Sequence, residues 1–449
     1  MNRKYKSIVI STMLLLCMFF CSGCSDLSFS DNSIIRPPRA TGDKAEIQDI
    51  ISQKAGGKYT LKYPQNGDYR SAIIMHDSVQ TGESAVALYS TDNDPNIQVC
   101  IISLVDDEWK CIGNFVSSAS GVDRVMFEDI SGDGKDDLII GWNVYNNQKT
   151  LSAYSFEGDS IREMAIDDTY SEIVVADIID DGVDDIVLLS LSGTDTPSTA
   201  KLLQYSEQEK HPIGKFSLEL DPEITSFTNV LVGNIDSGKV GIIVDGEKPN
   251  GLLSTQIIYF DEKEKTLKNP LVTVNNNTVS NATTRKDIII SRDIDGDGNI
   301  EVPVTSQMSA SSNDKTETLC SVTAWKQLKT DDGTLNTKMT TVINYTDGYY
   351  FIMPDRWNGT VTAKTDPENR NMTFYMWNAK TGSVGDKLLT IYRFNDSEWQ
   401  NTDKSELIQF DIDNSSSKAV YAAQIFTTHA KDSLNITESE VKNSLKLIS

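Results

Sequence analysis

Histidine is scarce in this sequence, and the three that occur, His76, His211 and His429, lie far apart. A lone histidine lacks the partner that acid–base or nucleophilic catalysis needs, and no G-x-S-x-G, H-E-x-x-H or P-loop motif is present. Outside the first 24 residues no CxxC pair occurs, and no Cys/His cluster is present, so nothing in the sequence supports a zinc site. The sequence therefore gives no support to the common hydrolase, zinc-enzyme and nucleotide-binding classes.

Cysteine is also scarce, with six in 449 residues, and three of the six lie within the first 24 residues. The remaining Cys100, Cys111 and Cys320 are too few for a scaffold built on disulfides. Cys100 and Cys111 flank a predicted hairpin. The sequence leaves two possibilities open for this pair, a cross-strand disulfide or two buried thiols.

Basic residues are in deficit, with 41 Lys and Arg against 65 Asp and Glu, for a net charge of −24. Such an acidic surface repels nucleic acid and anionic lipid headgroups, so we expect no nucleic-acid partner. It suits a protein that works outside the cell among cations, although solubility alone would also account for it.

Long apolar runs are missing apart from the 13 residues Ile8–Phe20, which are too short to span a bilayer of about 30 Å as a helix. Basic residues precede this run, so residues 1–23 are predicted to be a secretory signal peptide. Cys24 ends a Cys21-Ser-Gly-Cys24 segment that resembles a lipobox, in which the last cysteine is diacylated and becomes the mature N-terminus. Lipoboxes prefer Leu where Cys21 stands, and a plain signal peptide is the alternative.

A diacylated Cys24 would hold the protein at the outer face of the cell membrane, because two acyl chains anchor stably where one does not. Residues 24–42 are polar and are predicted to form a tether. Apolar residues at helical spacing predict a short helix over 43–54, which Gly56-Gly57 ends.

What the sequence has in abundance is aspartate at alternate positions. The clearest case begins at Asp293 and places an oxygen at every second residue. Ca²⁺ takes about six to eight oxygen ligands, and glycines allow the sharp turn that such a loop needs. The predicted ligands are Asp293, Asp295, Asp297, the backbone carbonyl of Asn299, and Glu301.

An EF-hand loop opens with the same residues but needs a helix on each side and a glutamate at position 12. Position 12 here is Val304, and the flanking runs 288–290 and 302–304 are short and rich in Ile and Val. The sequence therefore predicts a structural calcium loop between two strands.

The pattern recurs upstream. A second loop has the predicted ligands Asp129, Ser131, Asp133, the carbonyl of Lys135, and Asp137. A third loop has Ile179 in place of one ligand, so we expect weaker binding by its carboxylates Asp177, Asp181 and Asp185. Degenerate copies at Asp77 and Asn234 lack ligands and are expected to be turns without an ion.

The five copies start at residues 77, 129, 177, 234 and 293, and a spacing near fifty residues is typical of β-propeller blades. Over 129–137 and 293–301 the sequence resembles FG-GAP/VCBS repeats, the calcium-loop blades also found in integrin α chains, and the chain resembles Gram-positive lipoproteins that carry them. We therefore expect a mainly β chain, with a propeller of about five four-stranded blades over 43–345. A sixth blade is possible if residues 59–63 pair with a strand assigned elsewhere.

Residues 346–449 differ in character and predict a small α+β domain with weak similarity to the PsbP-like fold. A capping box at Thr437–Glu440 predicts a closing helix over 441–447. Several aromatic residues of this domain could stack on sugar rings, although aromatics on strands are also typical of a core: Trp357, Trp377, Tyr392 and Trp399.

Together these features predict a lipid-anchored, extracytoplasmic, calcium-stabilised propeller that acts as a binding or envelope-associated module. Its partners would be the membrane, through Cys24, and a protein or glycan. We expect that it is not an enzyme. The alternative is a carbohydrate-active enzyme, a glycosidase or lyase on a propeller scaffold, for which the sequence supplies no carboxylate pair outside the loops.

Overall fold

The structure is a computed structural model that describes residues 42–78, 82–144, 148–158, 160–193, 196–275, 278–309, 318–411, 419–428 and 430–448. The predicted signal peptide, Cys24 and nearly all of the predicted tether lie outside the described residues. Within the described part, the helices are too short or too polar for any of them to cross a bilayer.

The described chain forms two compact units. The first comprises the described residues of Met1–Lys62 with Ala72–His76 and Glu83–Ser117, and the second comprises Tyr63–Ser71, Asp77–Gly82 and Ser118–Ser449.

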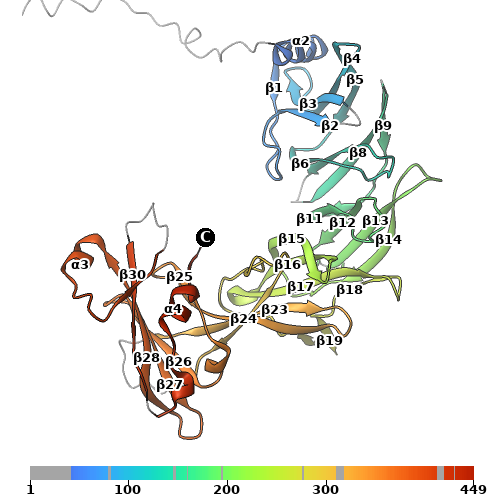
Figure 1. The fold of residues 1–449 in the computed structure, drawn as a ribbon. Helices are drawn as coiled ribbons and strands as arrows, with labels where there is room; N and C mark the ends of the chain where they lie inside the picture. The colour runs from blue at the N-terminus through green and yellow to red at the C-terminus, as the bar shows by residue number, and fades with distance from the viewer. Residues whose placement is uncertain are drawn as a thin grey trace, which may run out of the picture. The chain divides into compact units, whose positions relative to one another are not determined.

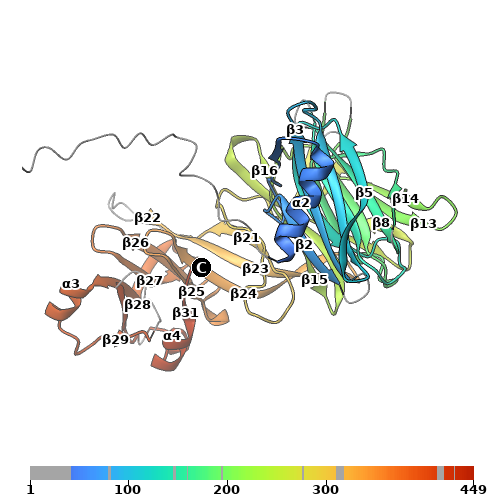
Figure 2. The same ribbon diagram turned by 90° about the horizontal axis from the view of Figure 1, so that it is seen from above.

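The first unit packs one helix on one antiparallel sheet (Figure 2). Helix α2 (Asp43–Ala55) matches the helix predicted over 43–54, and it ends where Gly56 takes a left-handed φ of 64°. Its Ile47 and Ile51 are fully buried in a core that includes Trp109. The sheet has the order β1-β3-β4-β5, with β2 also on β3: β1 (Tyr59–Leu61), β2 (Ile73–Ser78), β3 (Gly82–Thr91), β4 (Ile97–Val105) and β5 (Glu108–Ser117).

This unit contains the segment at 59–61 and the Cys100/Cys111 pair, both of which the sequence left open. Strand β1 pairs with β3 of the same sheet, so the segment at 59–61 adds to the first sheet and starts no sixth blade. Cys100 and Cys111 are free thiols whose Sγ atoms lie 3.4 Å apart. Burial raises the pKa of the Cys100 thiol above its ordinary value.

The second unit begins with three antiparallel sheets whose strands follow one another by hairpins, as in propeller blades (Figure 1). The first of the three has the order β10-β8-β7-β6 with β9 also on β8: β6 (Gly121–Glu128), β7 (Asp137–Asn143), β8 (Lys149–Glu157), β9 (Ser160–Met164) and β10 (Thr169–Tyr170). The next two run in sequence order: β11 (Glu172–Ala176), β12 (Asp185–Ser190), β13 (Thr199–Ser206) and β14 (His211–Glu219), then β15 (Ser226–Asp236), β16 (Lys239–Lys248), β17 (Leu252–Asp261) and β18 (Thr266–Lys268).

The short 3-10 helix η2 (Pro249–Gly251) lies between β16 and β17, and the small hairpin β19 (Thr273–Asn275)–β20 (Thr278–Ser280) follows β18. Two further sheets then complete this unit. One sheet has the order β21-β23-β24-β25-β31: β21 (Val302–Gln307), β23 (Ser321–Lys329), β24 (Thr334–Asn344), β25 (Tyr349–Ile352) and β31 (Leu445–Leu447). The other has the order β22-β26-β27-β28-β30-β29: β22 (Thr318–Leu319), β26 (Val361–Asp366), β27 (Asn371–Asn378), β28 (Ser383–Asn395), β29 (Ile408–Gln409) and β30 (Ala419–Ile425). With them lie η3 (Asp355–Trp357), α3 (Asp396–Asn401), η4 (Asp432–Leu434) and α4 (Glu438–Ser444).

The predicted fold class is confirmed. The chain is mainly β, with propeller-type antiparallel sheets followed by a small α+β part. The expected boundary between residues 345 and 346 falls inside a sheet, because β24 pairs with β25 across it and β31 then pairs with β25. The two compact units also divide the chain elsewhere.

Two predicted elements are corrected. The closing helix α4 has the predicted capping box at Thr437 and Glu440 but ends at Ser444, because residues 445–447 leave it to pair with β25. The run 288–290 before the fifth loop is not a strand. Its backbone is held by side chains instead: the Ile289 carbonyl accepts from the Arg285 guanidinium, and the Ser291 amide, two residues further on, donates to Asp245.

Candidate functional site

The loops at 129–137, 177–185 and 293–301 share one hydrogen-bonding scheme. In each, the first carboxylate accepts the backbone N–H groups of the fourth, fifth and sixth loop residues, over distances of 2.7–3.2 Å. The sixth residue is a glycine with positive φ in all three, as at Gly298, where φ is 87°. These bonds draw the chain around the first aspartate, which is why the alternating carboxylates converge.

The ninth residue of each loop is a carboxylate that points back under the loop from the start of a strand. Asp137, Asp185 and Glu301 are each at most 1% exposed. One carboxylate oxygen accepts a backbone N–H from the second or third loop residue, at 2.9–3.2 Å. A buried carboxylate with so few donors is costly to ionise.

The fifth loop brings the predicted ligands together most closely. One carboxylate oxygen from each of Asp293, Asp295 and Asp297 lies within 4.8 Å of the others, and among the described residues this is the only cluster of metal-ligating side chains that meets this limit. Glu301 is not part of this cluster, but its Oε1 is buried and has no hydrogen-bond partner among the described residues. Three converging carboxylates and a buried, unpaired carboxylate oxygen in the same loop suit a cation such as Ca²⁺, which binds oxygen donors.

The second and third loops are less well prepared for an ion. The carboxylates of the second loop do not meet the 4.8 Å limit. A lysine ammonium lies near an aspartate in both the second and the fifth loop, at 3.8 Å for Lys135 and Asp133 and at 3.4 Å for Lys338 and Asp297, so this contact does not distinguish them. In the third loop, Ile179 packs against the apolar core, and Gln204 donates to Asp181 at 2.8 Å. The Lys135 N–H donates to Asp133, and the Asn299 N–H donates to Asp297, both at 2.9 Å. Coordination of an ion by the carbonyls of Lys135 and Asn299 stays a prediction.

The degenerate copies are hairpins. Strand β2 ends at Ser78 and β3 begins at Gly82, so the copy at Asp77 has no room for a nine-residue loop. The copy at Asn234 is a two-residue turn in which Ser237 and Gly238 have φ of 44° and 84°. There Asp236 accepts instead from the N–H and hydroxyl of Thr330, both at 2.8 Å.

Sequence reasoning missed a contact that joins neighbouring loops. The carbonyl of Asp129, first in its loop, accepts the N–H of Asp184, eighth in the next, at 3.1 Å. The carbonyl of Asn234 accepts the N–H of Ile300, again from position one to position eight, at 2.8 Å. No local sequence signal announces this bond, since it joins backbone groups about sixty residues apart.

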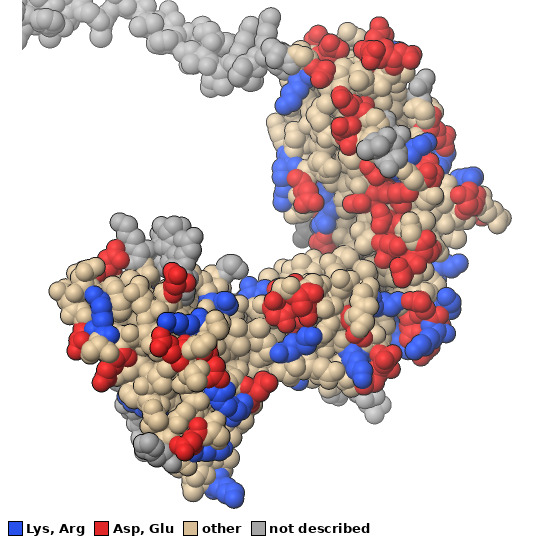
Figure 3. All heavy atoms as spheres, in the orientation of Figure 1, with Lys and Arg blue, Asp and Glu red and all other residues tan. Residues whose placement is uncertain are grey.

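Burial and the charges of nearby loop aspartates raise the pKa of the ninth-position carboxylates. Burial is the main cause at the ninth position, with the other loop aspartates adding to it, and the pKa reaches about 6 at Asp137, about 7 at Asp185 and about 7 at Glu301. Glu128, just before the second loop, also reaches about 7 through burial and then the charges of Asp184 and Asp136. Figure 3 shows Asp and Glu side chains gathered over the propeller-type sheets of the second unit.

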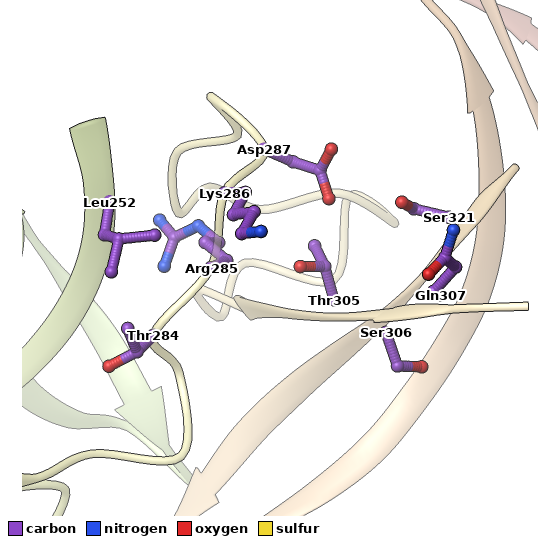
Figure 4. A pocket seen from close by; sticks show the side chains of 9 residues that line it. All are labelled: Leu252, Thr284, Arg285, Lys286, Asp287, Thr305, Ser306, Gln307 and Ser321. Carbon is purple, nitrogen blue, oxygen red and sulfur yellow. The ribbon is translucent and has the colours of Figure 1, made fainter. Parts of the chain in front are cut away.

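A separate polar cavity of about 530 Å³ lies between the segment after β20 and strands β21 and β23 (Figure 4). Lys286 and Asp287 line one side, and Gln307 and Ser321 line the other. Arg285 also borders it, but its guanidinium donates to Asp245, Thr255, Thr283 and Ile289, so it supports the wall. Sequence reasoning did not find this cavity, because its residues come from four separate segments: Leu252, 284–287, 305–307 and Ser321.

No protein-family model and no curated protein matches the chain. Two solved structures are similar to it over 73% of its length at 10% identity: a protein from Lactobacillus plantarum, with 94% of that chain covered and a TM-score of 0.31, and a putative 6-phosphogluconolactonase from Bacteroides fragilis, with 92% covered and a TM-score of 0.28. The second comparison corrects one prediction. The expectation that this chain is not an enzyme is withdrawn, because the matched structure is named for an enzymatic activity. At this TM-score the likeness indicates no reaction, substrate or site for this chain.

The raised pKa values predict how the cation-free protein responds to pH. The folded state keeps protons on Asp137, Asp185 and Glu301 that the unfolded chain has already released, so the free energy of unfolding falls as pH rises from about 4 to about 7. With a chelator present, residues 42–449 should melt at a higher temperature near pH 5.5 than near pH 8. Glu301→Gln, which cannot ionise, should reduce this difference, and a melting temperature that rises over the same interval would contradict the assignment.

Proposed function

We propose that this chain is a calcium-binding, extracytoplasmic β-propeller-type protein, held at the outer face of the cell membrane by a diacylated Cys24 and acting as a binding module of the cell envelope. One observation carries the calcium part: the fifth loop combines three converging carboxylates with the buried, unpaired Glu301 oxygen. Carboxylates brought together in one loop repel one another, and a divalent cation removes that cost.

The residues that would hold the ion are the side chains of Asp293, Asp295, Asp297 and Glu301, with the Asn299 carbonyl as a fifth donor. The role we assign to the ion is structural. The N–H that bonds to the neighbouring hairpin belongs to Ile300, directly before Glu301. Fixing Glu301 therefore also fixes the contact between the fifth loop and the β15–β16 hairpin.

The FG-GAP/VCBS assignment belongs to this proposal. It is supported by the scheme shared among the three loops, which puts the spacing, the glycine and the buried ninth carboxylate in the same relation each time. The anchor rests on the lipobox-like Cys21–Cys24 segment alone.

A second candidate function is a carbohydrate-active enzyme, and the cavity beside Asp287 favours it. Asp287 is the one carboxylate among the cavity-lining residues, and Lys286 lies next to it. A carboxylate can take a proton from an attacking water, and the lysine and surrounding hydroxyls could bind a polyhydroxylated substrate. A paired-carboxylate glycosidase mechanism would need a second acid that this lining does not contain.

Calcium binding is tested by calorimetric titration of cation-stripped residues 42–449. The fifth loop should give the tightest site because it has four carboxylates, and the second loop a weaker one because it has three. Asp295→Ala should remove the first and Asp133→Ala the second, and each should lower the melting temperature only when calcium is present. A calcium concentration ten-fold above the dissociation constant adds about 1.4 kcal/mol to the free energy of unfolding.

The matched control for this experiment is Glu83→Ala, which removes an exposed carboxylate near the degenerate first copy. It should leave calcium binding and the calcium-dependent melting shift unchanged. Equal losses in all three variants, or no melting shift in the wild type at millimolar calcium, would mean that the loops are acidic turns.

The anchor is tested by labelling cells with an alkyne analogue of palmitate. The wild-type protein should carry the label and stay with the membrane fraction, whereas Cys24→Ala should lose the label because the acylated thiol is gone. Label retained by Cys24→Ala would show that Cys24 is not the modified residue.

The enzyme candidate is tested with a panel of glycosides, acidic polysaccharides and sugar lactones. Turnover should fall at least about ten-fold in Asp287→Asn, because the amide cannot take up the proton, with the melting temperature unchanged. Asp331→Asn, on an exposed turn outside the cavity lining, is the control. Turnover that is equal in both variants, or absent in the wild type, rules out Asp287 as a base for these substrates.

A further inference from the structure

The six-stranded sheet of the α+β part has two different faces. One face is the core of this part, in which Phe374, Leu389 and Ile391 are fully buried. Trp357 is also fully buried, with its indole N–H donating to the Leu434 carbonyl at 2.9 Å, and Trp399 is 9% exposed. These two tryptophans are therefore structural and are not free to stack on a ligand, whereas Tyr392 and Trp377 are only partly buried.

The opposite face carries polar and aromatic side chains in rows that cross the central strands β26, β27, β28 and β30. Strand register sets one row as Lys364, Thr373, Thr390 and Gln424 on β26, β27, β28 and β30. The adjacent row contains Asn371 beside Tyr392. Because these residues sit on paired strands, their spacing is fixed by the sheet and not by loops.

Two cavities lie on this face and share Asn371 and Tyr392. The smaller, about 150 Å³, is lined by Lys364, Thr373 and Thr390 of the polar row. The larger, about 740 Å³, extends past Phe394 to Glu406 and Gln424. We call the two together the C-terminal groove. Its size falls in the usual range of ligand sites, about 300–1,000 Å³.

The polar groups of the groove are held in place. Gln424 donates to Glu406 at 2.6 Å, and its carbonyl oxygen is 3.4 Å from the Tyr392 hydroxyl. The Tyr392 and Phe394 rings lie nearly parallel, with centroids 5.8 Å apart and planes inclined by 24°. The result is an aromatic surface bordered by amides, hydroxyls and a carboxylate whose positions are set before any ligand arrives.

We propose that the C-terminal groove binds a neutral oligosaccharide. A sugar ring has an apolar C–H face that packs on an aromatic ring and an edge of hydroxyls that both donate and accept hydrogen bonds. The groove matches both, with Tyr392 for the face, and Asn371 and Gln424 for the edge. This assignment rests on the proposed envelope-binding function and names its ligand class.

Other occupants fit less well. The charged residues that line the groove are two basic and three acidic, so it has no excess of positive charge to select an anionic polymer: Lys364, Lys387 and Asp366 at one end, and Asp403 and Glu406 at the other. An extended peptide usually binds by adding a strand at a sheet edge, whereas this groove lies on a sheet face. The chain's net charge of −24 opposes nucleic acid.

The test uses residues 42–449 on an array of neutral oligosaccharides, namely glucan, mannan, galactan and N-acetylglucosamine chains, followed by calorimetry with the best binder. Wild type should bind at least one of them, and Tyr392→Ala should weaken binding at least about ten-fold with an unchanged melting temperature. Tyr392→Phe keeps the ring and should lose less affinity. Tyr63→Ala, which removes a 59% exposed aromatic residue outside the groove, is the matched control and should bind as wild type.

The outcomes separate this proposal from the calcium proposal. Asp295→Ala, assayed below its melting temperature, should keep glycan affinity even though it loses calcium. Binding that survives Tyr392→Ala would move the glycan site elsewhere on the chain. No binding to any neutral saccharide, or binding to peptides alone in a parallel peptide array, would overturn the proposal while leaving calcium binding untouched.

Discussion

The buried carboxylate at the ninth loop position is the constraint on which the repeat architecture depends. Asp137, Asp185 and Glu301 sit at the start or edge of a strand, almost without solvent contact, and each holds the loop above it through a backbone N–H. An ionised group in that position needs positive charge nearby. A proton supplies it at low pH, and a divalent cation would supply it at neutral pH, where the same loop also gathers its other oxygens.

The loops also determine how successive sheets meet. The bonds from position one to position eight tie Asp129 to Asp184 and Asn234 to Ile300, so neighbouring sheets are joined at the loop edge by the same backbone groups. Gly132 lies so close to Val183 that an added Cβ would be 2.8 Å from its Cγ2. The conformation of a loop and the packing of the neighbouring sheet therefore depend on each other. An ion that stabilises a loop would also stabilise the contact between that loop and the next sheet.

Much of this could be predicted from the sequence, because the loop chemistry is local. The spacing of carboxylates, the positive-φ glycine and the apolar flanks of Asp129 and Asp177 all lie within about fifteen residues, and they predicted loops between strands. The run 288–290 before Asp293 was wrongly predicted to be a strand, because its conformation depends on residues distant in the sequence. Its backbone is held by Asp245 and Arg285, a fully buried pair forty residues apart, and local pattern cannot reveal such a partner.

The same distinction explains why the candidate recognition surfaces escaped the sequence. The C-terminal groove combines residues on four strands, spanning Lys364 to Gln424, with residues of the segment 402–407, and only the register of β26 to β30 places the strand residues side by side. Aromatic content alone pointed equally to Trp357, which the structure buries, and to Tyr392, which lines the groove. Side-chain chemistry can be read locally, but whether a face is covered or open depends on strand order. A chain that fixes its loops with buried carboxylates can therefore keep an open face elsewhere for binding, because the two rely on different residues.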